Sequence, residues 1–264
     1  MKSYFLITCF LVFSHISFAQ HKSRINFNKG WKFKLDSVRS YSDPSVNDKN
    51  WRNLNLPHDW SIEGSFSKDN PAGTGGGALP GGIGWYRKTF FVPLSQKGNE
   101  TFIEFDGVYR NSEVFVNGQS VGRRPNGYIS FQYDITQQLK FGSNNVIAVK
   151  VDNSKQPNSR WYSGSGIYRN VWLTSLDPSH IKHWGTFITT PVIQQGNATV
   201  YINTRIKEAY AQLSLVTTIY DAGGKKVGYD STDVFASELN RKVEIKIQNS
   251  GLLINLIYTK QFQN

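Results

Sequence analysis

Short runs in which apolar and polar residues alternate constrain the fold of this chain more than any other feature. Residues 101–106 alternate in this way, and residues 146–151 place Ile147 and Val149 on one face with Lys150 on the other. A two-residue period is typical of half-buried β-strands. No stretch combines a 3.6-residue apolar period with helix caps. Many short strands separated by turns predict an all-β chain, built as a sandwich or a barrel.

Turn signals divide these runs. Asn117-Gly118 follows the apolar run 113–116 and is the strongest two-residue hairpin signal, because both positions tolerate a positive φ. Asp221-Ala222-Gly223-Gly224 predicts a second turn, between two later runs. Both turns predict antiparallel pairing of the strands on either side.

The character of the sequence changes near Asp177-Pro178, which predicts a domain boundary at about residue 179. The later part is a series of plain alternating strands, with predicted apolar faces formed by Ala198, Val200, Ile202, Thr204 and Ile206, by Leu213, Leu215, Thr217 and Ile219, and by Val243, Ile245 and Ile247. This pattern predicts an immunoglobulin-type sandwich over residues 179–264. Such a fold needs about 100 residues, so we expect this unit to lack at least one strand.

The first nineteen residues have the layout of a secretory signal peptide. A basic Lys2 precedes an apolar run from Tyr4 to Phe18, and small residues at Ser17 and Ala19 predict cleavage after Ala19. The run is too short and wrongly flanked for a membrane span. We therefore expect a secreted or periplasmic protein without a membrane span, whose mature chain begins at Gln20.

The formal charge of +11 does not indicate a nucleic-acid partner. The basic residues form no run of five, and no nucleic-acid-binding motif accompanies them. A solvated basic surface is the favoured interpretation, with the charge spread over Lys22, Arg24, Lys29, Lys32, Lys34, Arg123, Arg124, Lys182, Lys225, Lys226, Arg241 and Lys242. The single cysteine excludes a disulfide framework and any zinc site with several cysteine ligands.

Aromatic residues and glycines gather in three loop-like stretches of the first unit, residues 56–64, 73–88 and 159–169. A sugar site combines an aromatic platform with groups that make charge-assisted hydrogen bonds. Arg160-Trp161 and Asp59-Trp60 each supply that combination, and they are the predicted substrate-binding residues. Packing of these tryptophans in the core is the alternative.

Other motifs predict no catalytic residue, cofactor or metal site. The glycine-rich run lacks the Lys-Ser/Thr of a phosphate loop. His58 and Asp59 are adjacent and cannot face each other as base and orienter, so His58 is interpreted as a structural hydrogen-bonding residue. Asp59 and Glu63 are two carboxylates on one loop, but nothing fixes the separation that a glycosidase needs. His180 and His183 have a spacing that weakly resembles a metal site, but no third metal ligand lies nearby in the sequence.

Six motifs follow one another in a fixed order: Gly30-Trp31-Lys32-Phe33, Leu56-Pro57-His58-Asp59-Trp60, Gly84-Trp85-Tyr86-Arg87-Lys88, Phe105-Asp106-Gly107-Val108, Val116-Asn117-Gly118 and Arg160-Trp161-Tyr162-Ser163-Gly164-Ser165-Gly166-Ile167-Tyr168-Arg169. In this order they resemble the N-terminal part of glycoside hydrolase family 2, most closely its secreted β-galactosidase-like members. The resemblance is strong over about residues 24–178 and looser over 180–250.

The resemblance implies a jelly-roll sugar-binding domain over residues 20–178, then an immunoglobulin-like domain. In the family a (β/α)₈ barrel with two catalytic glutamates follows, and jelly-roll loops reach the rim of its active site. The resemblance implies that Arg160 and Trp161 lie on the loop that approaches this rim, and they are the first candidates for substrate binding. Asp59 and Trp60 are the next candidates. Gly84-Trp85 and Gly166-Ile167-Tyr168 are expected to hold strands and turns in place.

Two departures from the family pattern shape the functional hypothesis. A barrel needs roughly 250 residues, and no such length follows Asp177. Residues 249–258 also replace the usual closing segment of the family's sandwich, which predicts a truncated or frame-shifted ending. The leading hypothesis is a non-catalytic N-terminal portion of a retaining exo-glycosidase that meets a terminal β-galactoside or related glycan. The alternatives are a free-standing carbohydrate-binding module and a structural or adhesive sandwich protein.

Overall fold

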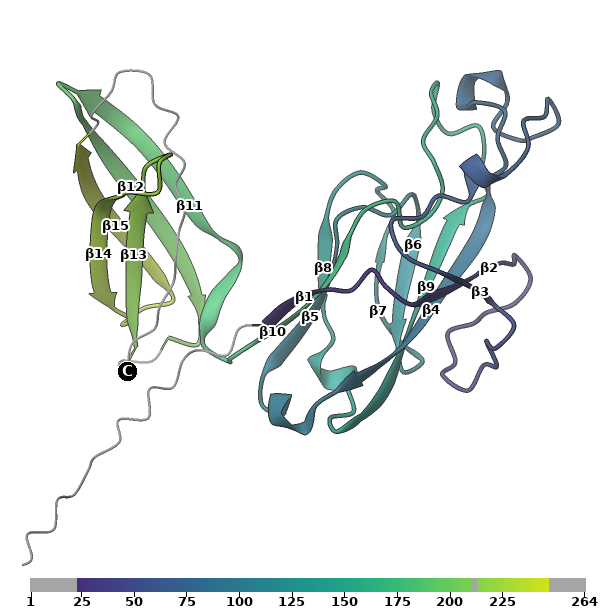
Figure 1. The fold of residues 1–264 in the computed structure, drawn as a ribbon, viewed down its shortest axis with the longest axis horizontal. Coiled ribbons are helices and arrows are strands. Elements are labelled where there is room, and N and C mark those ends of the chain that lie inside the picture. The colour runs from purple at the N-terminus through teal and green to yellow at the C-terminus, as the bar shows by residue number, and fades with distance from the viewer. Residues whose placement is uncertain (1–22, 210–212, 247–264) are drawn as a thin grey trace, which may run out of the picture. The chain divides into compact units, whose positions relative to one another are not determined.

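The computed structural model describes residues 23–209 and 213–246, and it is built from β-strands (Figure 1). The leader predicted at residues 1–19 and the altered ending predicted at residues 249–258 lie outside the described residues. The chain divides between Pro178 and Ser179 into two compact units. Within the described residues the helical segments are single 3₁₀ turns, namely η1 (Ser61–Glu63), η2 (Thr74–Gly76), η3 (Leu94–Gln96) and η4 (Thr136–Gln138). The predicted all-β fold is confirmed.

The first unit is a jelly-roll sandwich of two antiparallel sheets. One sheet has six strands, in the order β3 (Arg52–Leu54), β2 (Trp31–Leu35), β4 (Gly82–Val92), β9 (Ser143–Asn153), β6 (Ser112–Val116) and β7 (Gln119–Arg124). The other has four strands, in the order β1 (Ser23–Asn26), β10 (Val171–Leu176), β5 (Glu100–Phe105) and β8 (Phe131–Asp134).

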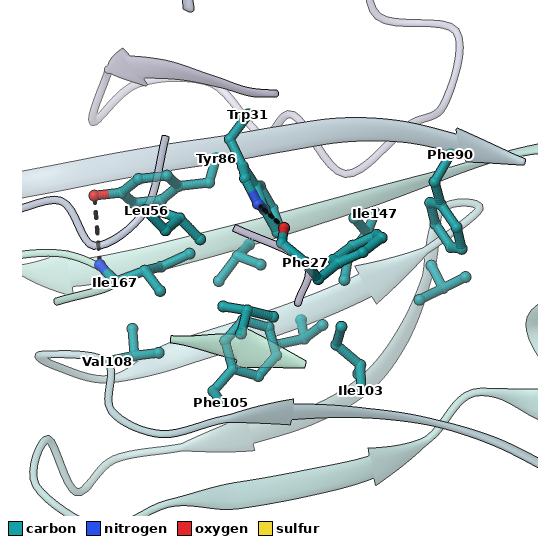
Figure 2. Close-up of a cluster of buried hydrophobic side chains, with 14 of the residues drawn as sticks. Phe27, Trp31, Leu56, Tyr86, Phe90, Ile103, Phe105, Val108, Ile147 and Ile167 are labelled. Atoms are coloured by element: carbon teal, nitrogen blue, oxygen red, sulfur yellow. Dashed lines mark hydrogen bonds between the residues drawn. The ribbon is translucent and has the colours of Figure 1, made fainter. Parts of the chain in front are cut away.

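The main core lies between these two sheets (Figure 2). Ile147 and Val149 of β9 are fully buried against Ile103 and Phe105 of β5 in one cluster, as the two-residue period predicts. Trp31 also lies in this core, where its indole nitrogen donates to the carbonyl of Phe27 at 2.8 Å. The buried ring thus keeps a partner for its polar atom, which burial requires.

The predicted Asn117-Gly118 hairpin joins β6 to β7. Asn117 has φ +49° and Gly118 has φ +87°, the positive values that a two-residue hairpin turn of this kind requires. The side-chain amide of Asn117 also donates to the carbonyl of Gln138 at 2.7 Å. The turn is therefore fixed by its own backbone and by a neighbouring loop.

A second apolar cluster covers the outer face of the six-stranded sheet, formed by Tyr41, Trp51 and Trp85. Beside it, the Arg87 side chain is 1% exposed. Its guanidinium donates to the carbonyl of Asp43 at 3.0 Å and to the carboxylate of Asp48 at 3.1 Å. Arg87 thus fastens the segment between β2 and β3 onto this face.

The second unit packs a three-stranded sheet against a two-stranded one. The three strands are, in order, β11 (His180–Gln194), β12 (Asn197–Lys207) and β15 (Glu238–Lys246), and the pair is β13 (Ser214–Tyr220) and β14 (Lys226–Asp233). The faces predicted for β12 and β15 are confirmed as buried over the described residues, and Ile202, Ile219 and Val243 meet in one cluster. Residue 247 lies outside the described residues. In the third predicted face, Leu215, Thr217 and Ile219 of β13 are buried, whereas Leu213 precedes the strand and is half-buried.

Arg241 corrects the interpretation of the basic residues as a solvated surface. It is 7% exposed and lies inside the second sandwich. Its guanidinium donates to the hydroxyl groups of Thr217 and Thr204, the latter at 2.8 Å. The sequence could not reveal that Arg241 is buried. A charged residue at an inward-facing position is buried only where other strands supply hydrogen-bond acceptors, which here are Thr204 and Thr217.

Within the described ranges, no helix has the length and apolar character that crossing a membrane would require.

Candidate functional site

Three loops of the first unit converge at one end of the sandwich, and we call them the rim: residues 55–81 between β3 and β4, residues 125–130 before β8, and residues 154–170 between β9 and β10. Backbone hydrogen bonds tie the first loop to the third. The amide of His58 donates to the carbonyl of Ile167 at 2.8 Å, and the amide of Trp60 donates to the carbonyl of Ser165 at 3.0 Å. The first and third rim loops are therefore held together by backbone hydrogen bonds and are not independent of each other.

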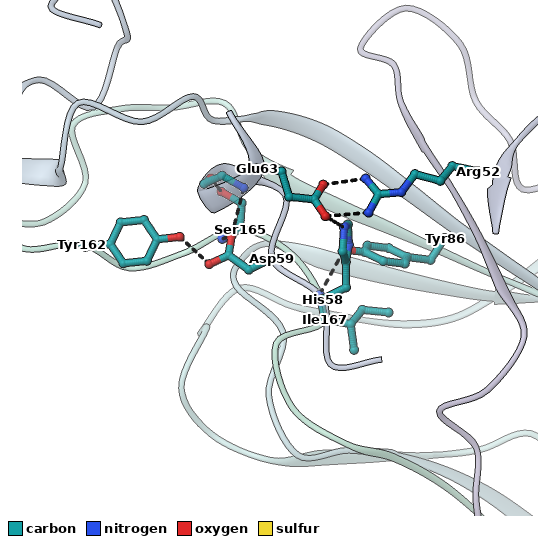
Figure 3. Close-up of polar contacts among 9 residues, drawn as sticks. Arg52, His58, Asp59, Glu63, Tyr86, Tyr162, Ser165 and Ile167 are labelled. Carbon is teal, nitrogen blue, oxygen red and sulfur yellow. Dashed lines mark hydrogen bonds and ion pairs between the residues drawn. The ribbon is translucent and has the colours of Figure 1, made fainter. Parts of the chain in front are cut away.

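The Asp59 carboxylate joins the two long loops of the rim (Figure 3). It accepts hydrogen bonds from the backbone amide of Ser61 at 3.0 Å, from the backbone amide of Ser165 at 2.8 Å, and from the hydroxyl of Tyr162. Next to it, Gly164 has φ +75°, and a Cβ there would stand 2.6 Å from Asp59 Oδ2. Glycine is thus required for the carboxylate to approach the backbone so closely.

Trp60 does not face a ligand, which corrects its prediction as a substrate-binding residue. The side chain is 2% exposed and stacks on Phe33, with ring centroids 5.6 Å apart. Its indole nitrogen donates to the carbonyl of Gly81 at 3.1 Å. The alternative interpretation, packing in the core, therefore holds for Trp60, because its ring belongs to the main core cluster.

Trp161 has the opposite environment and is 60% exposed. Its indole nitrogen donates to the hydroxyl of Tyr128 at 3.3 Å, and Tyr128 is itself 51% exposed. The adjacent Arg160 is exposed, and no described residue accepts a hydrogen bond from its guanidinium. The rim therefore presents two exposed aromatic rings, and the residue that precedes Trp161 in the chain carries an unpaired cation.

Tyr128 is a rim residue that the sequence did not indicate. It sits in a short turn in which its backbone amide donates to the side chain of Asn126 at 2.8 Å. Its ring meets Tyr109 edge to face, with centroids 5.3 Å apart. No local motif marks this position, since only the fold brings residues 126–130 beside the loop of Trp161.

His58 belongs to a second network, which joins the first rim loop to β4 (Figure 3). Its Nδ1 lies 2.7 Å from the Tyr86 hydroxyl, and its Nε2 lies 3.3 Å from a carboxylate oxygen of Glu63. Burial lowers the pKa of His58, although the nearby Glu63 opposes that shift. This environment agrees with the interpretation of His58 as a structural hydrogen-bonding residue.

Asp59 and Glu63, the two carboxylates considered as a glycosidase pair, are both held by hydrogen-bond donors of the chain. Glu63 accepts two hydrogen bonds from Arg52, both at 2.6 Å, and this pairing lowers its pKa. Asp59 already accepts from three donors. Over residues 23–209 and 213–246, no three histidine, cysteine, aspartate or glutamate side chains gather closely enough to hold a metal ion. The arrangement can bind a ligand by stacking and hydrogen bonding.

A β-sandwich whose loops present exposed aromatic rings and an unpaired guanidinium has the form of a carbohydrate-binding domain. The family comparison agrees. Residues 25–177 match the model of the sugar binding domain of glycosyl hydrolases family 2, and the chain belongs to that family.

The relatives of this chain are family 2 glycosidases. It is 50% identical over 217 residues to the beta-galactosidase BoGH2A of Bacteroides ovatus, covering 81% of this chain and 26% of that protein. It is 32% identical to a beta-glucuronidase of Formosa agariphila, covering 82% of this chain and 24% of the relative. A beta-glycosidase from Bacteroides vulgatus has a similar structure, with a TM-score of 0.78, 41% identity, and coverage of 85% of this chain and 29% of that one.

The chain thus spans about a quarter of the length of the curated relatives it matches. The matched region is their N-terminal sugar-binding part, which is a non-catalytic portion of a glycosidase.

Proposed function

We propose that the rim binds the terminal sugar of a β-galactoside, as part of a retaining exo-glycosidase. The observation that carries this proposal is the exposed pair Trp161 and Tyr128 together with the unpaired guanidinium of Arg160. The C–H face of a pyranose stacks on an aromatic ring, and its hydroxyl groups accept hydrogen bonds from the cation.

The contribution of this chain to hydrolysis is positional. In retaining hydrolysis, one carboxylic acid protonates the leaving oxygen while a second carboxylate forms a glycosyl-enzyme intermediate. The resemblance assigns both groups to a barrel domain. The rim loops, joined by Asp59 and by the backbone bonds to Ser165 and Ile167, supply a preorganised wall for the sugar.

Calorimetric titration of the chain with methyl β-galactoside tests this proposal. We expect binding that Trp161→Ala and Arg160→Ala each weaken. Trp184→Ala is a matched control, because Trp184 is also highly exposed, at 68%, but belongs to the second unit. Absence of binding, or equal affinity in all three variants, contradicts the proposal and favours a structural or adhesive role.

A parallel titration with methyl β-glucuronide identifies the sugar class. The unpaired Arg160 guanidinium can pair with a carboxylate as well as with hydroxyl groups, and one of the relatives is a beta-glucuronidase. If the glucuronide binds more tightly, and Arg160→Ala removes that difference, the rim recognises uronides rather than β-galactosides.

We also propose that the protein is exported. The basic Lys2, the apolar run from Tyr4 to Phe18 and the small residues before Gln20 support this. Mass spectrometry of the protein from the periplasm or medium is expected to give Gln20 as its first residue. A cytoplasmic protein that retains Met1 would contradict export.

A further inference from the structure

A hollow of about 400 Å³ lies on the three-stranded sheet of the second unit, whose strands are β11, β12 and β15 (Figure 1). Tyr201 and Asn203 of β12 line it and alternate with Ile202, which packs in the buried cluster inside the sandwich. The hollow therefore opens on the outer face of the sheet. Its volume falls within the roughly 300–1,000 Å³ of small-molecule sites. Its lining also includes Phe187, Thr189, Pro191 and Asn240.

Two accessible aromatic rings stand in this hollow. Phe187 is 69% exposed and Tyr201 is 44% exposed. In the sheet register Phe187 lies opposite Asn203, and Thr189 lies opposite Tyr201. The two aromatic residues are therefore diagonal neighbours on adjacent strands, about 7–8 Å apart, a separation that large side chains can bridge. One ligand can contact both rings.

Amide groups beside the rings keep hydrogen-bonding capacity free. Asn203 uses its side-chain nitrogen to donate to Asn240 Oδ1, at 2.8 Å, and to Glu238. Asn203 Oδ1 accepts no hydrogen bond from a described residue, and the side-chain nitrogen of Asn240 donates to none of them. The internal bond thus orients both amides and leaves one acceptor and one donor for a ligand.

The charged groups near the hollow are already paired. Lys242 Nζ lies 2.7 Å from a carboxylate oxygen of Glu244, and the Glu238 carboxylate accepts from Asn203. The guanidinium of Arg241 turns into the sandwich, where it donates to Thr204. An ionic ligand would lose its hydration without gaining an unpaired counter-charge among these groups. A neutral molecule with apolar faces and several hydroxyl groups fits this lining, and a sugar has both.

We propose that the hollow is a glycan site separate from the rim, and that it holds a neutral disaccharide unit. The C–H faces of its two pyranose rings stack on Phe187 and Tyr201. Its hydroxyl groups accept from the Asn240 amide and donate to Asn203 Oδ1. This site binds sugar whether or not the rim does, because all of its residues belong to the second unit.

The test is calorimetric titration of the full chain carrying Arg160→Ala/Trp161→Ala, so that the proposed rim contacts are removed. Lactose, cellobiose and xylobiose are the probes, and we expect at least one of them to bind. Adding Phe187→Ala or Tyr201→Ala should weaken that binding roughly three- to tenfold, the loss of one stacking contact. Asn240→Asp keeps an oxygen that can accept from Asn203 but removes the amide donor, and it should weaken binding as well.

Two matched variants serve as controls. Phe235→Ala and Tyr229→Ala remove rings that are 76% and 51% exposed in the same unit but do not line the hollow, and neither should change the affinity. The second site does not exist if no probe binds to the double variant, or if Phe187→Ala has no more effect than Phe235→Ala. If no sugar binds and the chain self-associates in sedimentation until Phe187→Ala is introduced, the hollow is a protein interface and the proposal is wrong.

Discussion

Tyr162 donates its hydroxyl hydrogen to the carboxylate of Asp59, a residue 103 positions earlier in the chain. Burial of the phenol, together with this hydrogen bond, raises the pKa of Tyr162, so the hydroxyl stays protonated and remains a donor. Tyr162 directly follows Trp161. The bond therefore fixes the backbone from which the exposed indole of the rim projects.

Removing this carboxylate should loosen the rim. Asp59→Ala leaves the amides of Ser61 and Ser165 and the Tyr162 hydroxyl without their acceptor, so we expect a loss of about 3 kcal/mol in the free energy of unfolding. Urea denaturation measures this. Asp69→Ala, on the same loop but exposed, is the control and should cost less than about 0.5 kcal/mol. Equal effects of the two substitutions would contradict the role assigned to Asp59.

Alanine substitutions at Gly164 and Gly73 distinguish the stability cost of backbone strain from that of a steric clash. Both have positive φ, +75° and +59°, but a Cβ at Gly73 would have no atom within 4 Å, whereas one at Gly164 would stand 2.6 Å from Asp59 Oδ2. Each change to alanine should cost about 1–3 kcal/mol because the backbone has a positive φ that side chains disfavour. Gly164→Ala should cost more, because the Asp59 side chain is held by three donors, and thermal unfolding of the two variants compares them directly.

Trp60 and Trp161 should show opposite phenotypes. Trp60→Leu leaves a cavity beside Phe33 and is expected to cost about 3 kcal/mol in the free energy of unfolding. Trp161→Leu should change stability by less than about 0.5 kcal/mol, because its ring is 60% exposed, while it weakens sugar binding. Chemical denaturation and calorimetric titration of both variants test this. Loss of stability in Trp161→Leu would show that its ring packs rather than binds.

His58 should make the stability depend on pH. Burial holds its pKa below the usual value of 6.5 in the folded chain, so the unfolded chain binds more protons as the pH falls through 6.5. The free energy of unfolding should therefore decrease from about pH 7 to about pH 5. His58→Gln should reduce this decrease, whereas His183→Gln, which removes an exposed ring, should leave it unchanged.

Arg87 should be essential for the outer layer of the first unit. Arg87→Met leaves the carbonyl of Asp43 without its donor and Asp48 with Lys32 as its remaining partner, at 2.6 Å. We expect a loss of about 3 kcal/mol, measured by urea denaturation. Arg123→Met is the control, since its side chain is 75% exposed and its ion pair with Glu113 is 3.8 Å long, and it should cost less than about 0.5 kcal/mol.

Much of the fold follows from local pattern. The alternation in β9 and β12 predicts which residues are buried, because neighbouring side chains of a strand must point to opposite faces. Asn117-Gly118 predicts the β6–β7 hairpin, because the turn needs positive φ at both positions. The order of the six motifs predicts the family, which the comparison over residues 25–177 confirms.

The candidate site could be predicted only in part. The sequence analysis assigned substrate binding to Trp161 and Arg160, but it assigned the same role to Trp60, because both tryptophans stand beside a charged residue. It did not indicate Tyr128, which reaches Trp161 from a turn more than thirty positions away. Contacts of this kind depend on loops from separate strands that meet at one end of the sandwich.

By itself, the sequence determined the strands, the turns and the family of this protein, since each depends on neighbouring residues or on motif order. Only the tertiary structure decided which aromatic and charged side chains are buried. Trp60 is covered and Trp161 is exposed, and Arg87 and Arg241 lie inside although they are charged. The reason is physical: burial depends on which distant segments cover a residue, and a buried guanidinium is tolerated only where those segments bring acceptors to it.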